Sequence, residues 1–302
     1  MAEIVLGMGS SHGPTIRTRP EAWERLGQKD MEDPRFDYET ELLNVKPDIQ
    51  DEITLERKQK RAEALKRGMA QLSRQLTEAE PDCIVMVSNL HGDIPPHQQQ
   101  IFSVFTGDGL PGDARMSSGD RLPTEPRLAN HLIERLSDDG FDVHACPDLG
   151  TAAGIGDAFT FLYELYASPG TLPMVPLMIS RYLPNQPSPR RAHQLGEGLR
   201  RAIQSWDSDM RVAVMASGGL SHQILDESLD RSVVKALTES DVDTLRSIPR
   251  DRLNRGPGTP EILNWIALSA AMDNAPMTLV DYVPCYRSLA GTGHGVTFGY
   301  WT

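Results

Sequence analysis

Short runs of apolar residues recur along the chain and predict buried strands. Five runs rich in Val, Ile, Leu and Met are each bounded by Gly, Pro, Ser or Asn: residues 4–8, 83–87, 174–179, 212–216 and 278–283. A continuous apolar run of this length between turn-forming residues is typical of a strand that is buried on both faces.

Between these runs, apolar residues recur at the helical period. The clearest example is the charged stretch 56–80, where four apolar side chains are spaced by four, three and four: Leu65, Met69, Leu72 and Leu76. Three more helices are predicted near residues 128–136 and over 192–206 and 260–272, the last with Thr259 as N-cap and Pro260 as its first residue. Alternating strands and helices predict an α/β sandwich with a mostly parallel central sheet and helices on both faces.

Residues 17–50 interrupt this alternation. The segment is polar, contains Trp23, Phe36 and Tyr38, and has no continuous period. We interpret it as an insertion of short helices and loops near the N-terminus. It either covers a site as a lid or elaborates the surface without a function, because long insertions cost little closure entropy. With no internal repeat, residues 1–302 are expected to form one domain.

The charge balance excludes some classes of partner. The chain has 42 Asp and Glu against 30 Lys and Arg, a formal charge of −12, whereas a nucleic acid or an anionic membrane requires a basic surface. The N-terminus has neither a basic segment nor a long apolar stretch, so we expect a cytoplasmic protein. Three widely separated cysteines without a C-x-x-C pattern fit a reducing compartment and offer no cysteine zinc site.

Three histidines follow three of the predicted strands. Two lie four residues past a strand and one lies six past: His12, His91 and His222. In a parallel sheet, ligands bind outside the carboxyl ends of the strands, so these imidazoles are expected to converge. For any one of them the alternative is an ordinary turn histidine, but the shared placement favours a common site. His294, in the glycine-rich stretch 291–295, is a reserve ligand or substrate contact.

Glu261 is the carboxylate best placed to join these imidazoles. It follows the Gly256–Pro260 breaker at the start of an apolar helix. On periodicity alone, the favoured interpretation is an ordinary first-turn glutamate that interacts favourably with the helix dipole. Two imidazoles and one carboxylate leave open positions on a divalent metal, the arrangement found in non-haem Fe(II) enzymes that use dioxygen.

These residues resemble the class III extradiol ring-cleavage dioxygenases, the family of the protocatechuate 4,5-dioxygenase beta subunit and of gallate and 3-O-methylgallate dioxygenases. The resemblance extends over nearly the whole chain. Its most specific parts are Ser-Gly-Gly-Leu-Ser-His at 217–222 and Glu-Ile-Leu-Asn-Trp at 261–265, supported by Ser-His-Gly-Pro at 11–14 and Asp-Tyr-Val-Pro at 281–284.

The resemblance implies a site and a reaction. Fe(II) would be held by His12, His91 and Glu261, and His222 would be the acid/base residue. The enzyme would use O2 to open the ring of a substituted catechol, of the protocatechuate, gallate or methylgallate kind, in aromatic catabolism. It would form a homo-oligomer, and the sequence leaves open whether a companion small subunit is needed.

Two positions depart from the family pattern. Relatives often carry Asp before the second ligand histidine, where this chain has Asn89-Leu90-His91, and Gly-His-Ala-Phe where it has Gly156-Asp157-Ala158-Phe159. The first departure bears on metal binding by His91 and on the substrate, and the second bears on the substrate.

An anionic substrate in an acidic protein requires local donors. We expect Arg287, Ser288 and Thr292, in the last loop, to contact it, with Arg181, Arg190 and Arg191 as further candidates. The alternative for each arginine is a surface residue that balances the excess of acid.

Two other functions stay open. His/His/Glu also matches the catalytic zinc site of a metal-dependent hydrolase. The departure at Leu90 also fits a non-catalytic relative that serves as a binding or assembly subunit.

Overall fold

The computed structural model describes residues 1–91, 95–111, 121–149, 156–167 and 172–302. Its strands are β1 Glu3–Ser10, β2 Cys83–Ser88, β3 Phe102–Phe105, β4 Leu110–Pro111, β5 Arg121–Leu122, β6 Val143–Cys146, β7 Met174–Ile179, β8 Arg211–Ser217, β9 His222–Ile224, β10 Thr278–Tyr286 and β11 Thr292–Trp301. Its α-helices are α1 Pro14–Arg17, α2 Trp23–Met31, α3 Tyr38–Asn44, α4 Ile49–Glu52, α5 Leu55–Ala79, α6 Pro126–Asp138, α7 Asp157–Tyr166, α8 Pro189–Gln204, α9 Glu227–Glu239, α10 Val242–Arg246, α11 Arg250–Leu253 and α12 Ile262–Ala271. Three 3₁₀ turns are η1 Pro20–Ala22, η2 Pro96–Gln98 and η3 Thr259–Glu261.

One mixed sheet organises the described residues. Its strand order is β10-β11-β1-β8-β2-β7-β3-β6, and β9 pairs with β11. The four central strands β1, β8, β2 and β7 are parallel to one another, while β11 runs antiparallel to β1, and β3 antiparallel to β7. Consequently, the carboxyl ends of the central strands open at one edge.

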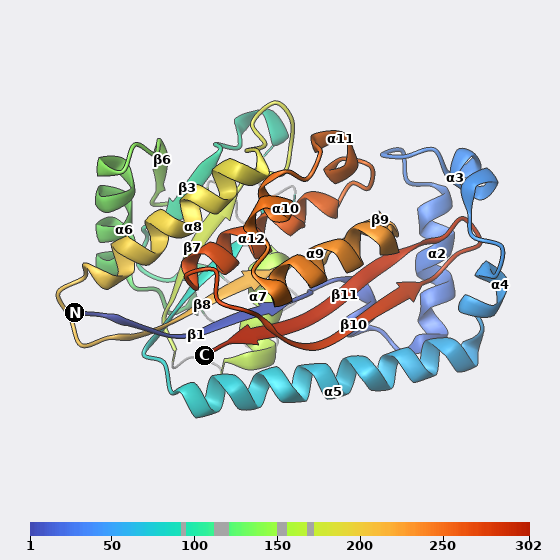
Figure 1. Ribbon diagram of the computed structural model, residues 1–302, viewed down its shortest axis with the longest axis horizontal. Helices are drawn as coiled ribbons and strands as arrows, with labels where there is room; N and C mark the ends of the chain where they lie inside the picture. Colours follow the sequence, from blue (N-terminus) through green and yellow to red (C-terminus); the bar gives the residue numbers. More distant parts are fainter. Residues whose placement is uncertain (92–94, 112–120, 150–155, 168–171) are drawn as a thin grey trace.

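Successive side chains of the central strands face two separate cores. In β2, Cys83, Val85 and Val87 face the layer of α6, α8, α9 and α12, whereas Ile84 and Met86 face the layer that contains α5 and α7. Strands that are buried on both faces require this continuous apolar run, because side chains alternate across the sheet. The predicted α/β sandwich with helices on both faces is confirmed (Figure 1).

The long helix α5 forms where the four-three-four spacing predicts it. The Thr54 hydroxyl accepts a hydrogen bond from the Arg57 amide and caps its start. Leu65, Leu72 and Leu76 are buried against the sheet. In Figure 1, α5 runs along β10 and β11.

The last strand departs from expectation. The sequence predicts no strand at the glycine-rich stretch 291–295 and places Thr292 in the last loop, but residues 292–295 lie in β11, which pairs with β10 on one side and with β1 and β9 on the other. The sequence lacks the usual strand signal because glycine has low β-propensity. Here the hydrogen bonds to a neighbouring strand on each side outweigh the low β-propensity of glycine.

The insertion consists of short helices, as predicted. It comprises η1, α2, α3 and α4, and the Trp23 side chain is fully buried. Asp30 of α2 accepts two hydrogen bonds from the Arg287 guanidinium, at 2.5 and 2.7 Å, and a third from the Thr292 hydroxyl at 2.5 Å. All three side chains are buried. This network fastens the insertion to the β10–β11 hairpin.

None of the helices in the described part of the chain has the length and apolar character needed to cross a membrane.

We predict that Asp30→Asn destabilises the protein by about 3–5 kcal/mol, because it leaves the buried guanidinium of Arg287 without its countercharge. Chemical denaturation measures the loss. The control is Glu56→Gln, which breaks the exposed Glu56–Lys60 pair and should change stability little. An Asp30→Asn protein as stable as the wild type would mean that this pair does not hold the insertion.

Candidate metal centre

Three adjacent strands end in serine and deliver the loops of the site. β1 ends at Ser10, β8 at Ser217 and β2 at Ser88, and β8 lies between the other two. His12 follows β1 and His91 follows β2. Adjacency of the strands therefore brings together two histidines that are far apart in the sequence. Of the loop 88–93, residues 92 and 93 lie outside the described residues.

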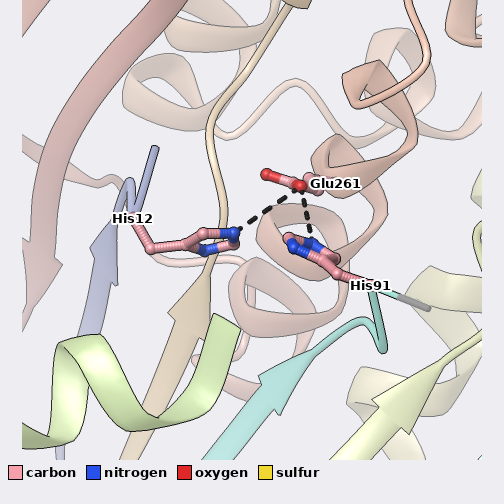
Figure 2. A group of neighbouring side chains, drawn as sticks. All are labelled: His12, His91 and Glu261. Carbon is pink, nitrogen blue, oxygen red and sulfur yellow. Dashed lines mark ion pairs between the residues drawn. The ribbon is translucent and has the colours of Figure 1, made fainter. Parts of the chain in front are cut away.

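The side chains converge on one oxygen atom of Glu261. Its Oε1 lies 3.7 Å from His12 Nε2, 3.1 Å from His91 Nε2 and 3.7 Å from His222 Nδ1. Figure 2 shows the first two histidines pointing at the carboxylate from separate strands. The structure thus brings together the four residues that the sequence assigned to the metal and to proton transfer.

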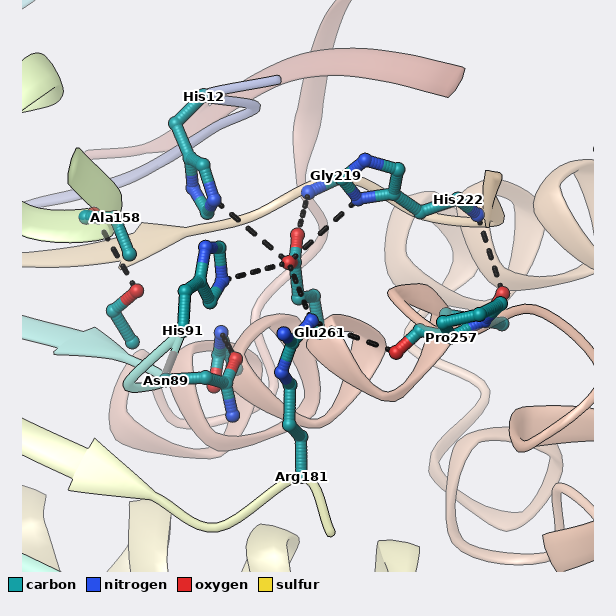
Figure 3. Close-up of polar contacts among 12 residues, drawn as sticks. His12, Asn89, His91, Ala158, Arg181, Gly219, His222, Pro257 and Glu261 are labelled. Carbon is teal, nitrogen blue, oxygen red and sulfur yellow. Dashed lines mark hydrogen bonds and ion pairs between the residues drawn. The ribbon is translucent and has the colours of Figure 1, made fainter. Parts of the chain in front are cut away.

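The same oxygen is approached by a cation. Arg181 Nη1 lies 3.8 Å from Glu261 Oε1 (Figure 3). Arg181 follows β7, the next strand of the parallel group, and is buried. Its Nη2 donates to the Tyr182 hydroxyl at 2.9 Å, and its Nε has no hydrogen-bond partner among the described residues.

Glu261 is fixed by the backbone around it. It ends the turn η3, just before α12, and is completely buried. Its other oxygen, Oε2, accepts a hydrogen bond from the Gly219 amide at 2.8 Å. The expectation that Thr259 caps the helix is wrong, since the Thr259 hydroxyl instead accepts from the His222 amide at 3.2 Å. That bond ties the His222 loop to the turn that carries Glu261.

Ser217 selects the tautomer of His12. The Ser217 hydroxyl donates its hydrogen to the Ala158 carbonyl, so it can only accept from His12 Nδ1, which lies 3.0 Å away. The proton of the neutral ring is therefore on Nδ1, and the lone pair of Nε2 faces Glu261. Sequence reasoning did not assign this role to Ser217, although its position at the end of a strand was visible.

His91 is oriented by its neighbours. The Asn89 side chain donates to the Ile179 carbonyl at 2.6 Å and accepts from Asn264 of α12 at 2.6 Å. On the far side of the ring, His91 Nδ1 lies 3.7 Å from Asp157 Oδ1. Asp157 also pairs with Arg17 at 3.3 Å. The aspartate that departs from the family pattern thus stands behind a candidate ligand.

His294 belongs to the site, as a reserve candidate. It lies opposite His222 across the β9–β11 pair, and the two rings stack with centroids 4.2 Å apart and planes at 15°. A Cβ added to Gly13 or to Gly219 would come within 1.9 Å of the His294 ring. Glycine is thus required at both positions, because their backbones enclose this imidazole. His222, Glu261 and His294 form a second group with ligand atoms close enough to share an ion.

Burial and charge set the protonation of the group. Burial lowers the pKa of His12 to about 3, so its ring is neutral near pH 7. Burial also lowers the pKa of His222. Burial by itself would lower the pKa of His91, but hydrogen bonds to Asp157 and Glu261 outweigh this effect and raise the pKa above its usual value. Burial alone would raise the pKa of Glu261, but His12 and His222 hold it well below its usual value. An ionised carboxylate facing a neutral imidazole fits a metal ligand set.

The donor set fits a divalent cation. His12 Nε2 and Glu261 Oε1 are buried, are both acceptors, and have no hydrogen-bond partner among the described residues. Two acceptors that face each other in a low-dielectric interior repel unless a cation lies between them. His12, His91 and Glu261 offer one ligand atom each within 4.8 Å of one another.

The expected substrate contacts of the last loop are engaged elsewhere. Arg287, Ser288 and Thr292 are buried in the network around Asp30, and the Ser288 and Thr292 hydroxyls are 2.6 Å apart. Their contact with substrate stays a prediction. Arg181, by contrast, stands beside Glu261.

Comparison with known proteins identifies similar sequences. The family model described as the catalytic LigB subunit of aromatic ring-opening dioxygenase matches residues 49–297. A gallate dioxygenase of Pseudomonas putida is 34% identical over 100 residues, which cover 33% of this chain and 29% of that protein. A 2,3-dihydroxyphenylpropionate/2,3-dihydroxicinnamic acid 1,2-dioxygenase of Klebsiella pneumoniae is 26% identical over 163 residues, 52% of this chain and 48% of that protein. The chain thus spans less than half the length of these two relatives.

A solved structure also aligns with the chain. That of the uncharacterized protein JW3007 from Escherichia coli K12 covers 98% of this chain and 99% of that chain, with a TM-score of 0.49 and 14% identity.

We predict that Ser217→Ala lowers the affinity for a divalent metal roughly 10- to 100-fold, the usual effect of removing the partner that orients a ligating histidine. The matched control is Ser88→Ala. Ser88 is also buried at a strand end and bonds to the Ala158 and Ser217 carbonyls, not to an imidazole. Chelator competition measures both affinities. Equal affinities in the two variants would remove Ser217 from this role.

Proposed function

The chain belongs to the family of catalytic LigB subunits of aromatic ring-opening dioxygenases, and on that basis we propose that it is an Fe(II)-dependent extradiol dioxygenase. It would open the ring of a substituted catechol, using O2. His12, His91 and Glu261 would hold the metal. His222 would be the acid/base residue.

One observation carries the proposal. A buried, ionised carboxylate oxygen faces a neutral imidazole whose lone pair is directed at it by Ser217, with a second imidazole nitrogen 3.1 Å away. Two imidazoles and one carboxylate on one side of a metal leave positions open for a diol and for O2. When bound, Fe(II) would supply the redox chemistry that couples the two substrates.

The residues of the chain would supply orientation and proton transfer. His222 lies on the side of Glu261 away from β2, beside the candidate ligands. As an imidazole whose pKa is lowered by burial, it is able to accept the proton of a diol hydroxyl at Nδ1 and return it later to a departing oxygen. Stacking on His294 would keep the ring in one plane. The surrounding burial would exclude water from the reacting atoms.

The substrate would carry a carboxylate. The relatives named above act, by their names, on gallate or on dihydroxyphenylpropionate and dihydroxycinnamic acid, which are aromatic diols or triols with an acid group. Arg181 is buried beside Glu261 with Nε free of partners among the described residues, so we assign it to that carboxylate. A fork of donors suits carboxylate recognition. Asp157, which lies beside His91, would restrict the ring substituents that the site accepts there.

Oxygen uptake tests this function against hydrolysis at the same site. We predict that protein loaded anaerobically with Fe(II) consumes one O2 per diol when given gallate, protocatechuate or 2,3-dihydroxyphenylpropionate. The matched control is the same protein loaded with Zn(II), which has no redox chemistry and should consume none. Iron-loaded protein without uptake on any of these diols would contradict the proposal and favour the metal-dependent hydrolase or the non-catalytic binding subunit.

Two substitutions separate ligand from acid/base residue. We predict that His91→Gln loses bound iron, whereas His222→Gln keeps it and loses turnover by about 10²–10⁴-fold, the range of general acid–base assistance. Metal analysis and turnover are measured on both folded variants. The reverse pattern of iron content would assign the metal to the group of His222, Glu261 and His294 instead.

A further inference from the structure

A cavity lies between the insertion and the body of the protein. It has a volume of about 360 Å³, and neither the three imidazoles nor Glu261 lines it. Its walls come from α2, from the start of α5 and from the turn that follows β10. Six of its lining residues matter here: Tyr38, Ile53, Met31, Leu289, Lys58 and Arg287.

Lys58 is the unusual member of this lining. Lys58 is only 7% exposed as a whole residue, but its ammonium group is not among the buried polar atoms, and no hydrogen bond or ion pair joins it to a described residue. A lysine of this kind buries its aliphatic stem and keeps its ammonium group at the water-accessible cavity. Burial lowers the pKa of Lys58. The ammonium group is therefore free to pair with an anion that enters the cavity.

Other charges of the cavity do not fill that role. Arg287 also lines it, but two of its nitrogens are bound by Asp30, and its Nη1 has no partner among the described residues. Glu24 is the acidic lining residue and forms no ion pair with Lys58. Since Glu24 is exposed, water screens its charge more than that of buried Lys58. Among the charged residues of the lining, two are cations, Lys58 and Arg287, and one is an anion, Glu24.

The rest of the lining is apolar. Ile53, Met31 and Leu289 line the same cavity, and the last two are 59% and 46% exposed. Tyr38 adds an aromatic ring. A ligand here would meet cationic donors on one side and carbon surface around them, the usual mixture of a small-molecule site.

We propose that this cavity binds an organic carboxylate with a small apolar body, its carboxylate on Lys58 and its body against Ile53, Met31 and Tyr38. This site is independent of the metal and requires no diol. Because its lining joins the insertion to the β10–β11 hairpin, an occupant would also hold these two parts together and stabilise the fold.

Benzoate is the probe that separates this cavity from the metal centre, since it has the carboxylate and the ring but no vicinal hydroxyls to chelate a metal. Calorimetric titration of the metal-free, full-length protein with benzoate should give saturable binding and a higher Tm. Lys58→Met should weaken that binding roughly 10- to 100-fold, the effect of losing one charge-assisted hydrogen bond. The control Lys60→Met, which removes an exposed lysine of the same helix, should leave it unchanged.

Several outcomes decide the question. Equal affinity for benzoate in Lys58→Met and wild type, or no saturable binding at all, would overturn the proposal. Binding of inorganic phosphate as tight as that of benzoate would overturn the carboxylate class and leave a general anion site. A Lys58→Met protein that keeps its oxygen uptake on diols while losing benzoate would support the site and separate it from the proposed reaction.

Discussion

The buried carboxylate of Glu261 is the constraint around which the site is built. A fully buried, ionised group requires compensation, and here it comes from imidazole nitrogens at 3.1 and 3.7 Å, from Arg181 and from the Gly219 amide. These partners come from the segments that follow β1, β2, β7 and β8, at the carboxyl edge of the sheet. The order of the strands, with β8 between β1 and β2, makes that convergence possible. Oε1 nevertheless has no hydrogen-bond partner among the described residues, so it is costly to bury without a cation and is available as a metal ligand.

The supporting residues act mainly by restricting freedom. Ser217 fixes which nitrogen of His12 carries the proton, Asn89 fixes the loop before His91, and the backbones of Gly13 and Gly219 enclose His294. None of these contacts need touch a substrate. They reduce the number of arrangements that the imidazoles can adopt, and a metal or a diol would then bind without first ordering its ligands.

The insertion connects the site to the rest of the fold through a second buried charge pair. Asp30 and Arg287 link α2 to the hairpin whose second strand carries His294. This hairpin also pairs with β9, which begins at His222. A displacement of the insertion would therefore reach the stacked rings through β11. The cavity lined by Lys58 lies between the same two parts, the insertion and the hairpin.

The sequence by itself determined the periodic parts of this protein. Continuous apolar runs predicted the central strands, because a strand that is buried on both faces needs apolar residues at every position. The four-three-four spacing predicted α5, because a helix that is buried along one face needs them only at the helical period. The three histidines after three strands indicated one site, since parallel strands end at a common edge. The resemblance to a family supplied the ligand set and its chemistry.

Only the tertiary structure decided the contacts that depend on distant residues. β11 became a strand despite its glycines because partners on both sides complete its hydrogen bonds. Arg287 and Thr292 meet Asp30, some 260 positions earlier in the chain, while Arg181 meets Glu261. No local pattern distinguishes these arginines, because a guanidinium is attracted to whichever carboxylate the fold places beside it. Thr259 likewise has the sequence of a cap, yet its hydroxyl binds the His222 amide, since packing brought that donor closer.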